Sequence, residues 1–166
     1  MPSTIENLKT AFAGESQANR KYLAFARRAE RDGYPQIARL FRAAADAETI
    51  HAHAHLQNMG GVGSTLENLR EAIAGETYEY TQMYPPMVEQ AIAENHKAKT
   101  MLDWASRVEK VHATLFQQAL AALGSGQDLS KMDVYVCPTC GDVEFGVPPE
   151  KCPVCGAAGA KFEKVV

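Results

Sequence analysis

An internal repeat constrains this chain more than any other feature of its sequence. Residues 4–15 read TIENLKTAFAGE and residues 65–76 read TLENLREAIAGE, and eight of these twelve positions are identical. In both copies the final Glu is followed 33 positions later by a Glu-x-x-His run, and the second copy is displaced from the first by 61 positions. The repeated side chains are Glu15, Glu48 and His51 in the first copy and Glu76, Glu109 and His112 in the second. Each copy therefore predicts a helical hairpin that brings two carboxylates and one imidazole.

The repeated side chains interrupt apolar stripes that have the period of an α-helix. Glu15, for example, follows Ile5, Leu8 and Phe12 on one helical face. Most Glu residues are surface charges, but here all four expected helices carry a Glu at a core position, where an unpaired carboxylate is costly. A bundle with a Glu from each of two helices and a Glu-x-x-His from each of the other two is the arrangement that holds two metals in carboxylate proteins. We therefore expect a di-metal site.

Capping and turn residues set the expected elements. Capping boxes of the form S-x-x-E begin at Ser3 and Ser64, and residues 60–63 (GGVG) form a flexible joint between the copies. The third helix should bend at Pro85-Pro86. Helices are predicted over residues 4–32, 35–58, 65–94 and 96–123. The predicted domains are an all-α four-helix bundle over 1–123, a polar linker over 124–133 and a small β module over 134–166.

The C-terminal module carries all the cysteines of the chain. They lie in CPTCG at residues 137–141 and CPVCG at residues 152–156. Two C-x-x-C pairs predict a tetrahedral four-thiolate site for zinc or iron, and disulfides are disfavoured in a cytoplasmic protein. A neighbouring di-metal site favours iron, because a redox site needs a supply of electrons. The expected ligands are Cys137, Cys140, Cys152 and Cys155.

Charge and hydropathy exclude several classes of function. The net charge is −3 and the sequence pI is about 6.0, which disfavours binding to nucleic acid or to an anionic membrane. No apolar run approaches the roughly 20 residues of a membrane span. The N-terminal residues MPSTIENLK begin a helix rather than a secretory signal, so we expect a cytoplasmic protein.

With both motifs in place, the chain resembles a rubrerythrin, which is a ferritin-like di-iron bundle followed by a rubredoxin-like domain. The resemblance covers essentially the whole chain. It rests on the repeated Glu and Glu-x-x-His set, on the four cysteines, and on Glu79, whose position in the first copy is occupied by Ala18. It implies that Glu48 and Glu109 bridge two iron ions.

The resemblance also implies individual roles for the remaining residues. Glu15 should bind one metal, together with Glu79 in the oxidised state and with His51 in the reduced state. Glu76 and His112 should bind the other metal, and the four cysteines should bind a single iron. Tyr22 and Tyr84 match tyrosines that hydrogen-bond to ligating carboxylates. The catalytic candidates are Glu79, His51, Tyr22 and Tyr84.

The activity implied is a peroxidase that reduces hydrogen peroxide to water. Its cofactors are two Fe in the carboxylate site and one Fe in the four-cysteine site, which Zn can replace in recombinant material. A separate NAD(P)H-dependent reductase or a rubredoxin should supply electrons, because the chain has no G-x-G-x-x-G motif. The resemblance further implies a homodimer with electron transfer between subunits, and the joint at residues 60–63 allows a hairpin-exchanged form of it.

Two other functions fit part of the pattern. A ferritin-like protein for iron oxidation and storage would use the same bundle, but the appended module disfavours a closed shell. A regulatory protein with a zinc ribbon would use the same cysteines. Among the neighbouring histidines, His53 is expected to face solvent, and His55 to pack beside the metal ligands. The physiological donor and the preferred peroxide stay open at this point.

Overall fold

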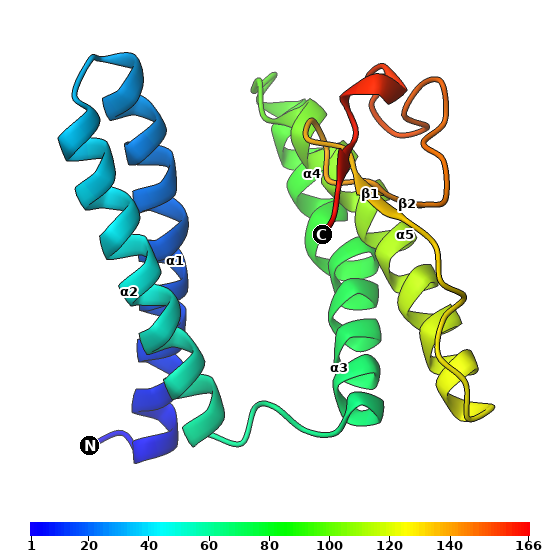
Figure 1. The fold of residues 1–166 in the computed structure, drawn as a ribbon, viewed down its shortest axis with the longest axis horizontal. Coiled ribbons are helices and arrows are strands. Elements are labelled where there is room, and N and C mark those ends of the chain that lie inside the picture. The colour runs from blue at the N-terminus through cyan, green and yellow to red at the C-terminus, as the bar shows by residue number, and fades with distance from the viewer. The chain divides into compact units, whose positions relative to one another are not determined.

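The computed structural model describes residues 1–166 and divides into two compact units, Met1–Gly63 and Ser64–Val166, each described here by itself. The first unit is a hairpin of α1 (Thr4–Arg31) and α2 (Pro35–Asn58) (Figure 1). Its helix limits agree closely with those predicted. The turn needs Gly33, whose φ of 85° lies in the left-handed region.

Alanines make the contact between α1 and α2. Every fully buried residue of the hairpin is an alanine: Ala26, Ala29, Ala38, Ala45 and Ala52. Small side chains let the two backbones approach closely. Asn19 fastens the pair, because its amide donates to Ala45 O at 2.7 Å and to Thr49 Oγ1 at 2.8 Å. Phe41 packs against these alanines, whereas Phe25, Leu40 and Ile50 stay exposed.

The second unit contains α3 (Thr65–Tyr78), the π-helical turn η1 (Glu79–Met83), α4 (Tyr84–Ala93) and α5 (Lys99–Gly124). A single helix with a proline kink was expected over residues 65–94. Instead the irregularity begins at Glu79, where Tyr84 N–H donates to Glu79 O five residues earlier. Pro85 and Pro86 then occupy the first turn of α4, where their missing N–H groups are tolerated.

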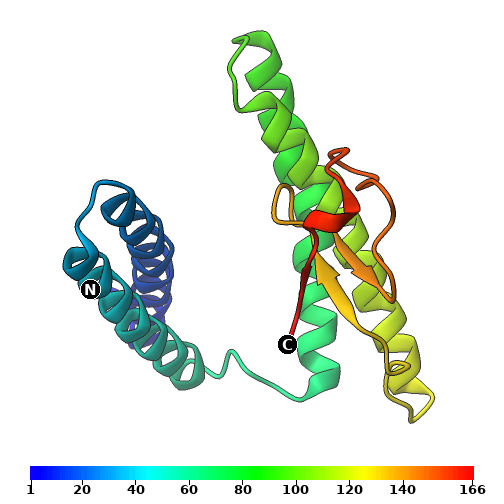
Figure 2. The same ribbon diagram turned by 45° about the horizontal axis from the view of Figure 1, so that its top comes forward.

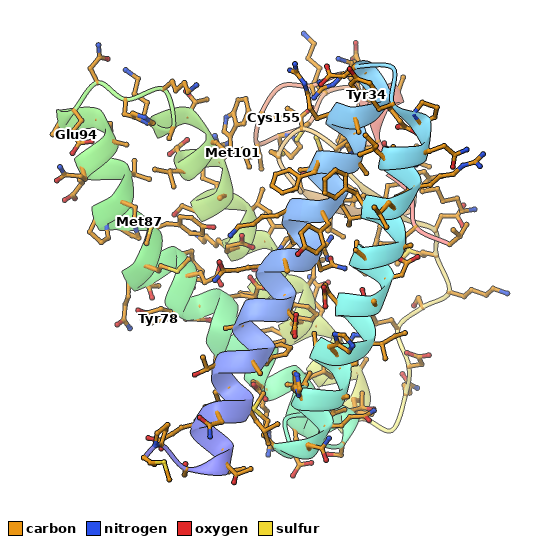
Figure 3. All side chains as sticks on the ribbon, turned by 90° about the vertical axis from the view of Figure 1, so that its left-hand side faces the viewer. Tyr34, Tyr78, Met87, Glu94, Met101 and Cys155 are labelled. Atoms are coloured by element: carbon orange, nitrogen blue, oxygen red, sulfur yellow. The ribbon has the colours of Figure 1, made fainter.

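The start of α5 also differs from the prediction. The fourth helix begins at Lys99 rather than at residue 96. Asn95 adopts a positive φ of 47°, and the His96 Nδ1 atom accepts a hydrogen bond from Ala98 N–H at 3.1 Å. The predicted break at Asn95 is therefore confirmed, but the turn continues to Ala98, which the sequence pattern did not indicate. Tyr78, Met87 and Met101, labelled in Figure 3, remain exposed on the helices of this unit.

The C-terminal module is a small antiparallel sheet packed on α5. Its strands are β1 (Val134–Val136), β2 (Val143–Phe145) and β3 (Glu163–Lys164), in the order β2-β1-β3. Tyr135 pairs with Glu144 on one side and with Lys164 on the other. The sheet lies beside α5 in the second unit (Figure 2). A mostly helical chain followed by a small β module is thus confirmed, and no helix has the length and apolarity needed to cross a bilayer.

Candidate metal centres

The first hairpin gathers the ligands predicted in the first copy of the repeat. Glu15 comes from α1, and Glu48 and His51 come from α2 one turn apart. One donor atom of each lies within 4.8 Å of the others. His51 Nδ1 is 2.9 Å from Glu48 Oε2 and 3.9 Å from Glu15 Oε1. The side chain of His51 is 54% exposed in this hairpin, whereas that of Glu48 is 18% exposed.

The second unit repeats this geometry with the second copy. Glu76 comes from α3, and Glu109 and His112 come from α5. His112 Nδ1 is 2.8 Å from Glu109 Oε2 and 3.9 Å from Glu76 Oε2. These distances match those of the first cluster to within 0.1 Å. The structure therefore shows two equivalent half-sites, each with two carboxylates and one Nδ1 atom directed at a common point.

The carboxylates of the second cluster are held close enough to disturb their ionisation. Burial and the neighbouring Glu109 raise the pKa of Glu76 to about 7. Burial and the charge of Glu76 raise the pKa of Glu79, while His112 opposes the shift. Crowded carboxylates of this kind are stabilised by a cation, which reverses the electrostatic cost. The donor set therefore fits divalent or trivalent metal ions.

Glu79 begins the π-helical turn and lies near enough to this cluster to interact with the charges of Glu76 and His112, although it is not one of the three side chains whose donor atoms lie within 4.8 Å of one another. The wider turn changes the direction of the side chains that follow, and such turns occur frequently at functional sites. Tyr84, which closes the turn, also lies near the carboxylates. Burial and then the charges of Glu109, Glu79 and Glu76 raise the pKa of its phenol. The structure thus brings Glu79 and Tyr84 together with the second half-site.

Tyr22 lies elsewhere in the first hairpin. Its ring packs against Phe25 at a centroid distance of 6.3 Å and against Phe41 at 6.1 Å. It makes no hydrogen bond to a carboxylate of its own hairpin, so its predicted role stays a prediction. Of the other histidines, His53 is exposed and His55 is half-buried.

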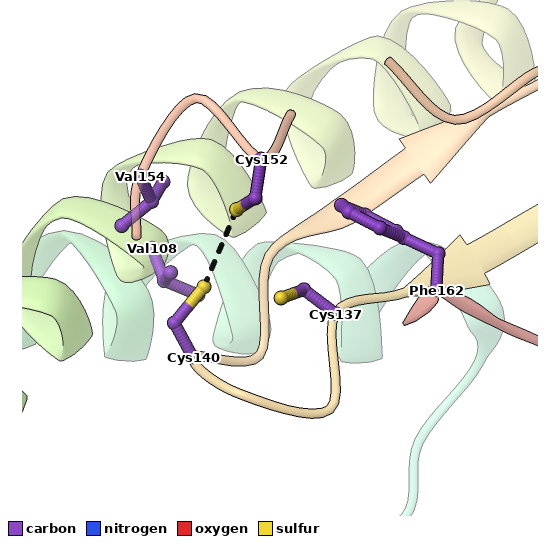
Figure 4. Close-up of a cluster of buried hydrophobic side chains, with 6 residues drawn as sticks. All are labelled: Val108, Cys137, Cys140, Cys152, Val154 and Phe162. Atoms are coloured by element: carbon purple, nitrogen blue, oxygen red, sulfur yellow. Dashed lines mark hydrogen bonds between the residues drawn. The ribbon is translucent and has the colours of Figure 1, made fainter. Parts of the chain in front are cut away.

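The four cysteines form a compact group with the size of a metal-thiolate site, and Figure 4 shows three of them, Cys137, Cys140 and Cys152. Cys137 Sγ lies 3.7 Å from Cys155 Sγ, and Cys140 Sγ lies 3.6 Å from Cys152 Sγ. All four are free thiols rather than disulfides. A tetrahedron with metal–sulfur bonds of about 2.3 Å has edges of about 3.8 Å. The sulfur atoms therefore fit one tetrahedral ion.

Backbone N–H groups prepare these sulfurs for the thiolate form. Burial opposes ionisation at Cys137, yet the N–H groups of Thr139 and Cys140 lower its pKa overall. Burial raises the pKa of Cys152 to about 11, although the N–H groups of Cys155 and Val154 favour its thiolate. A bound cation removes the burial penalty, and the N–H donors then tune the site.

Sequence reasoning missed the contacts that join the module to α5. His112 Nε2 lies 3.1 Å from Gly141 O, and Arg107 donates to Val154 O and to Pro153 O at 3.0 Å each. Their only sequence signal is the helical spacing that places Trp104, Val108 and His112 on one stripe of α5. That signal predicts a covered face without saying what covers it.

The comparisons with known proteins agree with this geometry. Residues 6–120 match the family model described as Rubrerythrin, and residues 135–163 match the one described as Rubrerythrin, rubredoxin-like domain. Rubrerythrin-2 of Clostridium acetobutylicum is 38% identical over 96% of this chain and 95% of its own length. Nigerythrin of Nitratidesulfovibrio vulgaris is 38% identical over 92% and 82%.

A solved structure of nigerythrin in its partially reduced state is also similar. The match covers 99% of this chain and 88% of the nigerythrin chain, with 33% sequence identity and a TM-score of 0.58. The residues of a di-iron carboxylate site and of a four-cysteine rubredoxin-like site are thus both present. On these matches and this geometry together, the chain belongs to the rubrerythrin family.

Proposed function

We propose that this protein is a peroxidase that reduces hydrogen peroxide to water. The observation that carries the proposal is the pair of equivalent half-sites, together with a four-thiolate site in hydrogen-bond contact with one of them. Iron in the carboxylate site supplies the two electrons that, with two protons, convert one peroxide into two waters, and iron in the four-cysteine site restores them singly. The roles of individual side chains follow from their positions.

The ligand roles form the first part of the proposal. Glu48 and Glu109 would be the bridging carboxylates, as the resemblance implies, and each lies within hydrogen-bond distance of the histidine of its own half-site. Glu15 belongs to one metal, with His51 and Glu79 as its alternative further ligands. The second metal is held by Glu76 and His112. A carboxylate suits the oxidised ion and a neutral imidazole the reduced ion, since the harder ligand favours the higher charge.

The second part of the proposal concerns the two tyrosines as hydrogen-bond donors. A tyrosine phenol is protonated at neutral pH, and the raised pKa of Tyr84 favours that form further, so its O–H can donate to a carboxylate or to the substrate oxygen. Tyr22, the other predicted tyrosine, sits on an aromatic face with Phe25 and Phe41. We propose that its hydroxyl donates to a ligating carboxylate once the two half-sites are joined.

Electron supply is the third part. The proposal places the reaction in the cytoplasm, with an NAD(P)H-linked reductase or a rubredoxin as donor. We assign the carboxylate chemistry to residues 1–123, the connection to the linker 124–133, and electron entry to the module 134–166. The resemblance implied a path from the four-cysteine site of one subunit to the di-iron site of another, whereas the structure places the module against His112 of its own chain.

The proposal is tested with protein whose iron and zinc contents have been counted. A red ferric-thiolate spectrum should mark iron in the module, and protein reduced by an artificial donor should consume peroxide with two electrons per molecule. Protein that carries three iron ions yet consumes peroxide no faster than free iron contradicts the assignment. If that protein instead oxidises and retains many iron ions in a large shell on size-exclusion chromatography, the storage function replaces it.

A further inference from the structure

The four-cysteine module and α5 share one buried core. Val108 of α5 is 2% exposed and belongs to the same cluster as Cys137, Cys140 and Cys152 (Figure 4). Trp104, one turn earlier, packs against this cluster. The loop between Cys152 and Cys155, called here the second knuckle, therefore packs on one face of α5 of the same chain.

Arg107 adds hydrogen bonds to this apolar contact between the module and α5. Its Nη1 and Nη2 atoms donate to two successive backbone carbonyls, those of Val154 and Pro153, both at 3.0 Å. These carbonyls belong to the knuckle between Cys152 and Cys155. A planar guanidinium can span two adjacent acceptors, whereas an ammonium acts as a single point charge. The other polar neighbour of Arg107 is Asp103, whose carboxylate lies 3.9 Å away on an exposed surface.

The same packing places the loop between Cys137 and Cys140, called here the first knuckle, next to the carboxylate site. Gly141 follows Cys140 directly, and its carbonyl lies 3.1 Å from His112 Nε2. An N–H on Nε2 leaves the lone pair of Nδ1 free toward Glu109 and Glu76, where the half-site converges. Glycine suits position 141 because its φ is 93°, in the left-handed region that other residues rarely adopt.

We propose that Arg107 is a positioning residue that holds the four-cysteine module on α5 of its own chain, so that Gly141 O stays within hydrogen-bond distance of His112 Nε2. This inference rests on the proposed function. If both sites held iron, this seating would let the thiolate iron pass one electron at a time to the carboxylate iron, and two such transfers would match the reduction of one peroxide.

The docking is tested without any turnover. Trp104 is the only tryptophan of the chain, so its fluorescence reports the seat directly in full-length protein with zinc in the four-cysteine site. Arg107→Met should lower the docking equilibrium constant by about tenfold, since it loses two charge-assisted hydrogen bonds. Acrylamide should then quench Trp104 more strongly, and amide exchange should rise in residues 137–141. Arg107→Lys should give a smaller effect in both measurements.

Asp103→Asn is the matched control, because it removes the 3.9 Å ion pair and leaves both carbonyl contacts. It should leave quenching and exchange unchanged. The same quenching in Arg107→Met as in the parent protein overturns the proposal, provided that circular dichroism and zinc content show a folded, loaded variant. Equal effects of Arg107→Met and Asp103→Asn overturn it as well.

The electron route is tested in iron-loaded protein by single-turnover reoxidation of the reduced thiolate iron, followed at its visible absorption. The rate should not change with protein concentration, and Arg107→Met should slow it by at least about tenfold through misplacement of the module. An unchanged rate in that variant overturns the route. If the parent protein fails to consume peroxide while Arg107→Met still exposes Trp104, the peroxidase assignment fails and the positioning role stands.

Discussion

Among single residues, Glu79 stands apart because the first repeat offers no counterpart to it. Its backbone begins a π-helical turn, and its carboxyl lies near Glu76 and His112. The six repeated ligands make two equivalent half-sites without it. A residue added to a site that is already complete changes reactivity more readily than it changes metal binding.

Glu79→Ala should therefore retain two metals in the carboxylate site and slow peroxide turnover by roughly tenfold or more. Metal counting and turnover with an artificial electron donor check both parts. Glu89→Ala, an exposed carboxylate on α4, serves as control and should turn over normally. Unchanged turnover in Glu79→Ala would remove the redox role assigned to this residue.

The raised pKa of Glu76 predicts how the stability of the metal-free protein changes with pH. Its pKa is about 7 in the folded state, above the ordinary 4.5, because of burial and then Glu109. Between these two values the folded state holds a proton that the unfolded state has released, so stability is greatest at the acid end and falls as pH rises. We expect the metal-free, reduced protein to lose about 1–3 kcal/mol between pH 5 and pH 7.5.

Urea unfolding followed by circular dichroism, after treatment with a chelator, measures this loss. Glu76→Gln should flatten the dependence, because an amide does not titrate. A slope that survives in Glu76→Gln would assign the effect to other groups. Metal should restore stability at the higher pH, where the carboxylates are charged.

At the scale of elements, the capping boxes of α1 and α3 have nearly the same hydrogen-bond distances, as the two ligand sets do. Ser3 accepts from Glu6 N–H at 3.2 Å, and Ser64 accepts from Glu67 N–H at 3.3 Å. In each box the Glu carboxylate accepts from the backbone N–H of the serine, at 2.6 Å and 2.7 Å. Each box begins a helix that carries a lone ligand, so the helix start also sets the position of that ligand.

Ser3→Ala and Ser64→Ala should each destabilise the protein by about 1 kcal/mol, through loss of one cap. Thermal unfolding of the metal-loaded protein measures both. Ser130→Ala, in the exposed linker and outside any helix, should have no effect. A destabilisation by Ser64→Ala but none by Ser3→Ala would show that the two helix starts are not equivalent.

The helices could be predicted from the sequence because capping, periodicity and the repeat agree with one another. Glu-x-x-His within a helix also determines its own geometry, which is why both histidine–glutamate pairs were found. The π-helical turn was not found, because two adjacent prolines suggest a kink at their own position and not at Glu79, six residues before Pro85. The break at Asn95 was predicted, but the later start of the fourth helix at Lys99 depends on a turn that periodicity does not encode.

For the whole molecule, the open question that the sequence raises is how the chains assemble. Large apolar side chains are exposed on the first hairpin, among them Leu40 at 70% and Ile50 at 69%. The four-cysteine module meets His112 of its own chain, so an exchanged and an unexchanged dimer both retain that contact. We expect a homodimer at micromolar concentration, and mass determination in solution checks it. A fully active monomer would contradict this expectation.

Two paired variants separate the forms of that dimer. Glu48→Gln disables the first half-site and Glu109→Gln disables the second. In a heterodimer of the two variants, hairpin exchange joins both intact halves into one complete site, whereas an unexchanged dimer contains none. Recovery of one two-metal site per heterodimer therefore indicates exchange, and no recovery indicates that each chain completes its own site.

Sequence reasoning was least able to predict contacts between segments that the chain order does not relate. The cysteine spacing indicated a metal, but nothing in it placed Gly141 beside His112. Arg107 sits on a helix surface like many other arginines, and its role depends on two backbone carbonyls 46 and 47 residues away. Such contacts arise from the docked surfaces and carry no local pattern.

The hydrogen bond between Gly141 and His112 breaks a symmetry that the rest of the chain preserves. A duplicated hairpin begins with two interchangeable halves, and the distances in the two ligand sets still reflect that origin. Yet the π-helical turn, Glu79 and the module all belong to the second copy, while His51 in the first copy has no partner for Nε2 in its own hairpin. Only the histidine of the second copy is hydrogen-bonded to the four-cysteine module, so the proposed function gives the two copies different roles: the second would receive electrons, and the first would adjust to the charge of the metals.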